Sequence, residues 1–365
     1  MKILHVLYSG LGGHGNVFFS FVKGTGKNEF LYEALFNGIE AVKPDYINIC
    51  HEYAIPWNFV PKRPGLDLRY YLNLVKNIKN SDADIVFLHS SAYIMPAWLG
   101  SVFSKKKKKI IVRETQANHL KVKMEWVWLF VAMLMADAIV FLSEAYRLEI
   151  AKKLSLVYRS KKIFVIPNGL DLDLYKPVNN NNSGELIIGM QSRLVRIKDH
   201  LTLLEAFSLL IKKDAYRQNQ YLLKIAGDGD YSQALQAKSE SLGLNNVVEF
   251  TGMLPENELL QFLHTLDIYV HASLGETMST AIMQAMACGL PVIASDVRGI
   301  NNMISHGTNG ILVPAKNPAA MCAAIELLIN SAGKRKELSI AARRCAEEKF
   351  SNASMVNAYR KLFLN

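Results

Sequence analysis

Short apolar runs alternate with longer stretches of helical periodicity along most of this chain of 365 residues. In the first half, apolar runs at residues 2–8, 84–88 and 110–112 are each followed by a polar or glycine-containing segment, and residues 46–50 are expected to form the second strand. Continuous apolar runs of this length are typical of parallel strands buried on both faces. Strands that alternate with helices predict α/β domains built on parallel sheets.

The same alternation restarts after a polar, asparagine-rich segment at residues 179–183, which is typical of a loop or linker. We expect strands at residues 186–190, 221–226, 247–250 and 268–271, and helices at residues 200–211, 232–242 and 256–264. The chain therefore predicts two doubly wound, Rossmann-like domains facing each other across a cleft. Their expected bounds are residues 1–167 and 168–345, with residues 346–365 forming a helix that packs back on the first domain.

Residues 273–296 combine a turn, a helix and a buried strand. The periodicity predicts a helix over residues 277–288, with Glu276 at its start and Gly289 at its end. A carboxylate beside the free amides of a helix N-terminus can serve a sugar and a phosphate together. The alternative is a simple N-cap in an α/β unit.

Three glycines after the first strand, Gly10, Gly12 and Gly15, match the spacing of the dinucleotide-binding fingerprint. That fingerprint requires an acidic residue about 20 positions further on, at the end of the second strand. Because we expect that strand only at residues 46–50, we interpret the glycines as a loop through which backbone approaches a phosphate, without an NAD site.

The segment 126–142 is almost entirely apolar but contains Asp137. It is shorter than the roughly 20 apolar residues that span a bilayer. We expect a buried helix up to Met135 and a strand at residues 139–142, and a helix that dips into the bilayer is the alternative. A run of five lysines, residues 105–109, is expected to be a solvated edge, with lipid head groups as the alternative partner.

The positive charge of the chain lies in its first half. Residues 1–167 contain 23 Lys and Arg against 13 Asp and Glu, a balance of +10, whereas residues 168–365 contain 19 of each. An anionic partner of the first half is therefore expected, unless the charge only keeps the protein in solution. No zinc-finger, RNA-recognition or helix-turn-helix pattern supports nucleic acid as that partner. The four cysteines have no metal-binding spacing, and the N-terminus does not resemble a signal peptide, so a cytoplasmic location is expected.

Several polar residues follow expected strands, where ligands of open α/β sheets gather. In the second half these are Arg193, Lys198 and the glycine turn at Gly227, and in the first half they are His89, Glu114 and His119. An arginine and a lysine can bind a diphosphate and stabilise it as a leaving group without a metal ion. Taken singly, each of these residues could equally be a surface charge or a buried structural residue.

Five segments resemble, in the right order, the motifs of the retaining nucleotide-sugar glycosyltransferases of family 4 (glycosyl transferases group 1), which have the GT-B fold. They are residues 165–175 (VIPNGLDLDLY), 192–207 (SRLVRIKDHLTLLEAF), 225–230 (IAGDGD), 245–254 (NNVVEFTGML) and 275–296 (GETMSTAIMQAMACGLPVIASD). The resemblance is strong over the second half, whereas the first half resembles the family only in its pattern.

The resemblance implies a role for several residues. Arg193 and Lys198 would hold the donor diphosphate, and Glu276 would bind the hydroxyls of the donor sugar. Further donor contacts are implied for Gly13, Gly227 and the backbone amides of Thr277, Met278 and Ser279. In the first domain, His89, Glu114 and His119 are candidates for the contact with sugar or acceptor.

One position departs from the family pattern. The family has a second glutamate eight residues after the first, where it binds the ribose hydroxyls, and this chain has Gln284 there. Glutamine still accepts a hydrogen bond but carries no charge, and charge-assisted hydrogen bonds are roughly twice as strong. The substitution is expected to weaken the ribose contact without abolishing it.

The expected activity is transfer of a hexosyl or N-acetylhexosaminyl group, with retention, from a nucleotide-sugar to a saccharide or lipid-linked acceptor in surface polysaccharide biosynthesis. A UDP-sugar is the first expectation for the donor, and no metal and no cofactor is expected. The basic first half, rich in tryptophan and tyrosine, predicts peripheral binding to an anionic membrane surface. The alternatives are a nucleotide-sugar epimerase on the same fold and a non-catalytic assembly subunit at the membrane.

Overall fold

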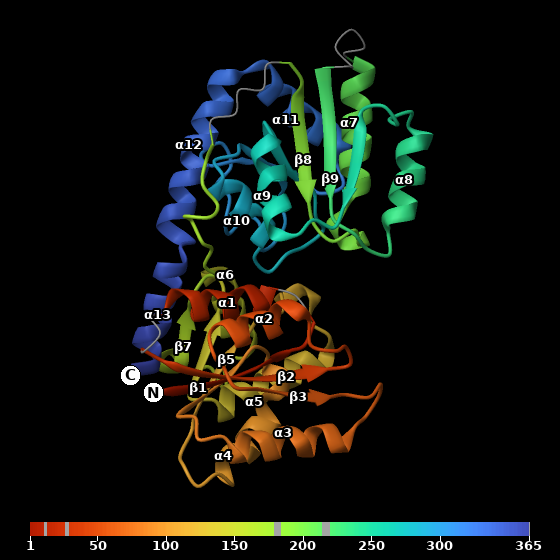
Figure 1. The fold of residues 1–365 in the computed structure, drawn as a ribbon. Helices are drawn as coiled ribbons and strands as arrows, with labels where there is room; N and C mark the ends of the chain where they lie inside the picture. Colours follow the sequence, from red (N-terminus) through yellow and green to blue (C-terminus); the bar gives the residue numbers. More distant parts are fainter. Residues whose placement is uncertain (11–12, 26–28, 179–183, 214–219, 365) are drawn as a thin grey trace. The chain divides into compact units, whose positions relative to one another are not determined.

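The computed structural model describes residues 1–10, 13–25, 29–178, 184–213 and 220–364. The chain divides into two compact units, each built around its own parallel sheet (Figure 1). Unit 1 comprises Met1–Gly169 and Asn352–Asn365, and unit 2 comprises Leu170–Ser351.

Unit 1 contains a seven-stranded parallel sheet of order β3-β2-β1-β4-β5-β6-β7. Helices α1, α2 and α13 cover one face of this sheet, and α3, α4 and α5 cover the other (Figure 1). The strands are β1 (Lys2–Tyr8), β2 (Leu31–Gly38), β3 (Trp57–Pro61), β4 (Ile85–Leu88), β5 (Lys109–Arg113), β6 (Ala138–Phe141) and β7 (Ile163–Val165). The helices are α1 (Gly13–Gly24), α2 (Pro44–Glu52), α3 (Leu68–Asn80), α4 (Ile94–Val102), α5 (Lys123–Met135), α6 (Glu144–Lys153) and α13 (Asn352–Leu364).

The expected strand at residues 46–50 is wrong, because these residues lie in helix α2. Pro44 occupies the first turn of that helix, where its missing N–H costs nothing. Tyr46, Ile49 and Cys50 are the buried residues, a spacing of three and four that belongs to a helix and not to a strand. The true second strand is β2, which ends at Gly38.

The true second strand changes the interpretation of the glycines at residues 10–15. Glu40 follows β2 closely, and the Tyr8 hydroxyl at the end of β1 donates to its carboxylate at 2.9 Å. An acidic residue therefore does stand near the end of the second strand. The spacing of the strands therefore does not exclude an NAD site.

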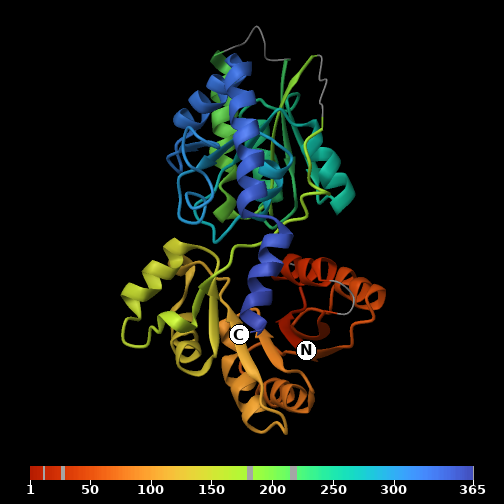
Figure 2. The same cartoon turned by 90° about the vertical axis from the view of Figure 1, so that its left-hand side faces the viewer.

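Helix α13 completes the core of unit 1. Its buried face packs against the aromatic cluster around β1 and α1, with the Tyr359 and Phe21 ring centroids 4.9 Å apart. The Lys109 ammonium on β5 donates to the carbonyl of Leu362 at 2.8 Å. Figure 2 shows the end of α13 beside the start of the chain.

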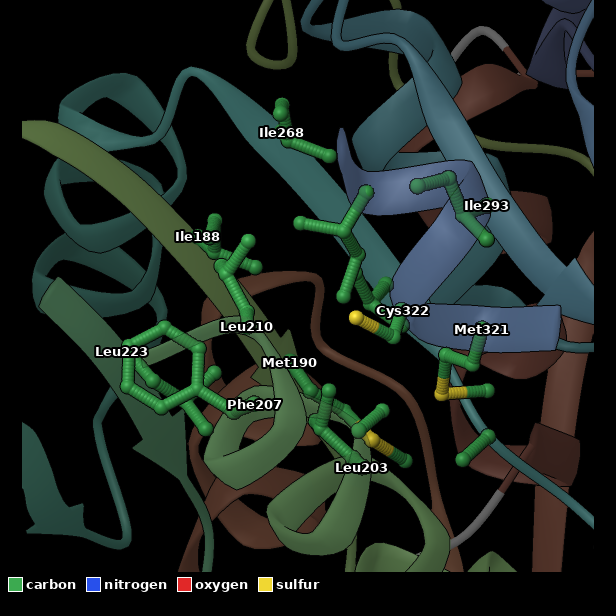
Figure 3. Close-up of a cluster of buried hydrophobic side chains, with 14 of the residues drawn as sticks. Ile188, Met190, Leu203, Phe207, Leu210, Leu223, Ile268, Ile293, Met321 and Cys322 are labelled. Carbon is green, nitrogen blue, oxygen red and sulfur yellow. The ribbon is translucent and has the colours of Figure 1, made fainter. Parts of the chain in front are cut away.

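Unit 2 contains a six-stranded parallel sheet of order β10-β9-β8-β11-β12-β13. One core lies between the sheet and α7, α8 and α11, where Met190, Phe207 and Met321 are among the buried side chains (Figure 3). A second core lies under α9, α10 and α12. The strands are β8 (Leu186–Gln191), β9 (Tyr221–Ala226), β10 (Val248–Gly252), β11 (Ile268–His271), β12 (Val292–Ser295) and β13 (Ile311–Val313). The helices are α7 (His200–Lys213), α8 (Ser232–Ser241), α9 (Glu256–Thr265), α10 (Thr280–Ala287), α11 (Pro318–Asn330) and α12 (Ala332–Lys349).

Both sheets have the doubly wound order, which reverses direction between β1 and β4 in unit 1 and between β8 and β11 in unit 2. The predicted α/β class with two parallel sheets is therefore confirmed. In such sheets, ligands bind outside the carboxyl ends of the strands that flank the reversal. The reversal points thus mark where functional side chains are to be sought.

Two expectations about the surface of unit 1 need correction. Lys108 is buried and donates to the carbonyl of Ala83 at 3.2 Å, and Lys109 belongs to β5, so only part of the lysine run is a solvated edge. Helix α5 is not wholly buried, because Val127, Phe130 and Leu134 are exposed. None of the helices in the described ranges is long and apolar enough to cross a membrane.

Candidate active site

The reversal point of unit 2 brings two loops together. One loop follows β8, the other follows β11, and these two strands are hydrogen-bonded neighbours. The Leu274 amide donates to the Ile197 carbonyl at 2.8 Å, and the Ser273 hydroxyl donates to the same carbonyl at 3.2 Å. These bonds join the loops and place Lys198 beside Glu276, although the two residues are far apart in the sequence.

Lys198 and Glu276 form an ion pair in which Nζ contacts Oε1. Their side chains are only 14% and 11% exposed, and His271 Nε2 lies 3.0 Å from the same carboxylate oxygen. Burial alone would raise the pKa of Glu276. The hydrogen bond from His271 and the positive charge of Lys198 outweigh that effect and lower the pKa to about 2. The site therefore holds an ionised carboxylate at neutral pH.

The hydrogen bonds of His271 define its protonation. An ionised carboxylate only accepts, so Nε2 must carry the proton that it donates to Glu276. Nδ1 then carries no proton in the neutral ring, and the Tyr269 hydroxyl, which donates its one hydrogen to the Gln191 carbonyl, lies 3.2 Å from it. Complete burial lowers the pKa of His271, which keeps the ring neutral. His271 thus positions Glu276, and its position at the end of an expected strand was the sequence signal for it.

The structure changes the expected position of Glu276 relative to the helix. Helix α10 begins at Thr280, and its N-cap is Ser279, whose hydroxyl accepts from the Ile282 amide at 3.4 Å. Glu276 lies three residues before that cap, so the prediction of a helix starting at residue 277 is wrong. Thr277 and Met278 are half-buried and lie between the carboxylate and the helix. The serine hydroxyl, and not the carboxylate, provides the capping bond.

Gly299 supports Glu276 from behind. Its φ of +90° favours glycine, and a Cβ there would lie 2.0 Å from the Glu276 carbonyl oxygen. The Glu276 amide donates to the carbonyl of Arg298 at 3.2 Å in the same turn. The sequence analysis missed this turn, because no pattern in residues 297–299 links them to position 276.

Gly227 has a comparable role behind the loop after β8. Its φ is +136°, and a Cβ there would lie 1.9 Å from the Ser192 carbonyl oxygen. The glycine therefore lets the turn after β9 press against the segment that leads to Arg193 and Lys198. Arg193 is exposed and lies outside the ion pair with Glu276, so the structure brings together Lys198 and Glu276 but not Arg193.

Gln284 on α10 takes part in a different set of bonds. Its Oε1 accepts from Gln191 Nε2 at 2.6 Å, and its Nε2 donates to the Tyr175 hydroxyl at 2.8 Å. The side chain is 8% exposed. These bonds use one of the two amide hydrogens and one of the two oxygen lone pairs. The second hydrogen and the second lone pair are left for a ligand.

The unit 1 candidates lie at the ends of its central strands. His89 follows β4, is buried, and its Nε2 lies 3.0 Å from His5 Nδ1. Glu114 follows β5, is buried, and pairs with Lys121 at 3.3 Å. His119 is exposed in a short 3-10 turn at residues 118–120. Gly13 begins α1, and the preceding residues 11–12 lie outside the described part of the chain.

Two known protein families match adjoining parts of the chain. Residues 172–345 match the family described as glycosyl transferases group 1, and residues 12–174 match glycosyltransferase family 4. The chain belongs to these glycosyltransferases. Its Lys198, Glu276 and Gln284 all lie within the part that matches group 1.

Two relatives extend over most of this glycosyltransferase. An uncharacterised glycosyltransferase of Methanocaldococcus jannaschii is 25% identical over 91% of the chain and 86% of the relative. The UDP-Gal:α-D-GlcNAc-diphosphoundecaprenol α-1,3-galactosyltransferase of Escherichia coli is 24% identical over 81% of the chain and 78% of the relative.

Solved structures share the fold. HepE of Anabaena, in complex with UDP-glucose, superposes with a TM-score of 0.83 at 20% identity, covering 100% of both chains. A glycosyltransferase of Rickettsia africae gives a TM-score of 0.84 at 20% identity, covering 99% of this chain and 97% of that chain. The predicted GT-B fold is confirmed.

Proposed function

We propose that this glycosyltransferase transfers a hexosyl or N-acetylhexosaminyl group, with retention, from a UDP-sugar to a hydroxyl of a saccharide or lipid-linked acceptor. The observation that carries the proposal is the ionised Glu276, held by Lys198 and His271 at the reversal point of the unit 2 sheet. Support for the donor comes from the UDP-glucose complex of HepE. Support for the acceptor comes from the Escherichia coli relative, whose name specifies a diphosphoundecaprenol-linked sugar.

The proposed donor site uses the charges of unit 2. Glu276 accepts hydrogen bonds from hydroxyls of the donor sugar. An ammonium group has three hydrogens, so Lys198 can keep its contact with Glu276 and also donate to the diphosphate. Arg193 and the amides of residues 277–279 complete the proposed diphosphate site, and Gln284 offers its remaining hydrogen and lone pair to the ribose.

The proposed reaction breaks the bond between the anomeric carbon and the phosphate oxygen and forms a bond from that carbon to the acceptor oxygen. The acceptor attacks on the face from which the diphosphate leaves, and its proton passes to the departing phosphate. Positive groups aimed at the charge that develops on the phosphate lower the barrier. Lys198 and Arg193 supply that charge in the proposal, so no metal ion is invoked. The roles of Gly13, His89, Glu114 and His119 toward donor or acceptor stay predictions, and so does peripheral binding to the cytoplasmic face of a membrane in surface polysaccharide biosynthesis.

The test is hydrolysis of a panel of UDP-, GDP- and TDP-sugars by the purified protein. We expect release of UDP from one UDP-sugar, with retention at the anomeric carbon seen by NMR when an acceptor alcohol is present. A rearranged sugar formed without any acceptor would identify an epimerase instead. Failure of every nucleotide to bind in calorimetry would overturn the proposal and favour a non-catalytic assembly subunit.

A further inference from the structure

Helix α5 has an unusual surface for a helix on the outside of a domain. Its buried side consists of Leu129, Ala132 and Met133, which pack into the core of unit 1. A surface helix normally turns polar residues to solvent on the opposite side. Here that side carries Val127, Phe130 and Leu134, which are 49%, 39% and 55% exposed. The spacing of three and four residues places these three side chains on one stripe.

Helix α4 extends this apolar surface, because it packs against α5. Trp98 is 36% exposed on α4, and Val102 and Phe103 at its end are 55% and 61% exposed. Each helix follows a parallel strand and runs back along the sheet, so both helices end at the amino-terminal edge of the strands (Figure 1). We call these six residues the α4–α5 face: Trp98, Val102, Phe103, Val127, Phe130 and Leu134.

Basic residues border the α4–α5 face at both ends of α5. Lys105 and Lys107 are exposed shortly after Phe103. Near the start of α5, Lys123 is exposed and the Lys153 ammonium lies 3.5 Å from the Trp126 ring centroid. Residues 94–135 contain eight Lys and Arg but only two Asp and Glu, Glu114 and Glu125. Glu114 is buried, and the Glu125 carboxylate accepts from the Val122 amide at 2.8 Å.

We propose that the α4–α5 face docks on the surface of an anionic lipid bilayer, with its apolar side chains in the acyl region and its lysines among the head groups. An exposed apolar patch bordered by polar residues marks an interaction site. Aromatic and aliphatic side chains beside lysines are the chemistry that binds the interface of an anionic membrane. A second copy of this chain is a less suitable partner, because its lysines would face lysines of the same charge across the interface. Docking on a bilayer would bring the enzyme of the proposed function to a lipid-linked acceptor. Binding to the bilayer can nevertheless be measured without any sugar.

The experiment is co-sedimentation of the full chain with vesicles of phosphatidylcholine, with and without phosphatidylglycerol, in the absence of nucleotide-sugar. We expect binding to the vesicles that contain phosphatidylglycerol, weakening as salt rises. The variant Val127→Ser/Leu134→Ser should weaken binding roughly tenfold or more, because it removes two apolar side chains from the interface. Its matched control is Leu327→Ser/Ile340→Ser on α11 and α12, where the native side chains are 51% and 54% exposed.

The lysines are tested separately. Lys105→Glu/Lys107→Glu should weaken binding at least roughly fivefold per charge and flatten the salt dependence, whereas Lys212→Glu/Lys336→Glu in unit 2 should not. UDP binding by each variant reports that unit 2 is folded. The proposal would be overturned if the wild-type protein did not bind anionic vesicles, or if Val127→Ser/Leu134→Ser bound them as tightly as the wild type. A dimer in analytical ultracentrifugation that the α5 variant dissociates would also overturn it, because the face would then cover a second copy. Donor hydrolysis is assayed without vesicles, so failure here leaves the proposed function standing.

Discussion

The two units have the same doubly wound architecture but bury different polar groups at the carboxyl ends of their central strands. Unit 2 holds an ionised carboxylate between Lys198 and His271. On the central strands of unit 1, His5 within β1 and His89 after β4 lie among aromatic rings, and a buried ion pair, Glu114 with Lys121, follows the next strand, β5. The net charges of the two units also differ. Unit 1 has 25 Lys and Arg against 13 Asp and Glu, and unit 2 has 17 against 19.

The difference separates two tasks that one fold can perform. In unit 2 an ionised carboxylate lies at the reversal point of the sheet, where a low dielectric makes each charged hydrogen bond strong. That arrangement suits a small polar donor. In unit 1 the excess charge is outside, where it acts over a distance on a large anionic partner and is screened by salt. The following predictions test whether the two units are divided in this way.

The largest effect is expected for Lys198→Ala. Removing one preorganised donor to a developing charge costs about 2–4 kcal/mol in the barrier, a loss of roughly 30- to 10³-fold in kcat. Steady-state hydrolysis of the UDP-sugar measures it, with Lys212→Ala on α7 as the control for removal of a lysine from unit 2. Unchanged turnover in a folded Lys198→Ala protein would show that the charge inside unit 2 does not serve the donor.

A second prediction concerns the neutral histidine inside unit 1. Burial lowers the pKa of His5 to about 3, below its ordinary 6.5. The unfolded chain therefore binds a proton below pH 6.5 that the folded protein does not bind, so stability falls as pH falls from 6.5 toward 3. The loss from this one group is about 2 kcal/mol between pH 7 and pH 5.

His5→Phe should remove that part of the pH dependence, because phenylalanine suits the surrounding rings and does not titrate. Urea unfolding of unit 1, followed at pH 7 and pH 5, measures the slope. The control is His51→Gln, an exposed histidine on α2, which should leave the slope unchanged. An identical slope in His5→Phe would mean that His5 is not held neutral by burial.

A third prediction tests the positioning of Glu276. His271→Phe keeps a ring beside Tyr269 but removes the Nε2 proton donated to the carboxylate. We expect a loss of roughly tenfold in kcat/KM, the value of one hydrogen bond to a charged group. The pKa of Glu276 should rise, which moves the acidic limb of the pH–rate profile toward neutral pH, and His271→Gln should recover part of the loss. A variant that only loosened the structure would lower activity without moving that limb.

The sequence predicted unit 2 better than unit 1, for physical reasons. Its strands are short, continuous apolar runs, so β9 (Tyr221–Ala226) and β11 (Ile268–His271) were predicted with their observed bounds, as was β1 in unit 1. In unit 1, residues 46–50 of α2 were mistaken for a strand, because they form a short, largely apolar run and the sequence alone does not show which of its side chains are buried.

The candidate site was predicted in part. Lys198 and Glu276 follow neighbouring strands, so their meeting could be anticipated from strand order. The position of His271 at the end of a predicted strand was a signal, but its contact with Glu276 could not be predicted from any local pattern, and neither could the close approach of Gly299 to the Glu276 backbone. For α5 a buried helix was predicted, with a helix that dips into the bilayer as the alternative, since a helix that is apolar all round is normally buried.

The smallest effect is expected where this chain departs from its family. Gln284→Glu should tighten UDP binding by about fivefold, because a charged acceptor for the ribose replaces a neutral one. The new carboxylate can still accept from Gln191, and the Tyr175 hydroxyl can reverse its role and donate to it. Calorimetry with UDP measures the change, and Gln261→Glu, at an exposed position on α9, is the control for adding a negative charge to unit 2 without altering the bonds of position 284. Weaker UDP binding in Gln284→Glu would mean that the amide of Gln284 serves to connect Gln191 on β8 with Tyr175 through its two hydrogen bonds. The charged side chains that contact the donor in unit 2 would then not extend from Lys198 and Glu276 to position 284.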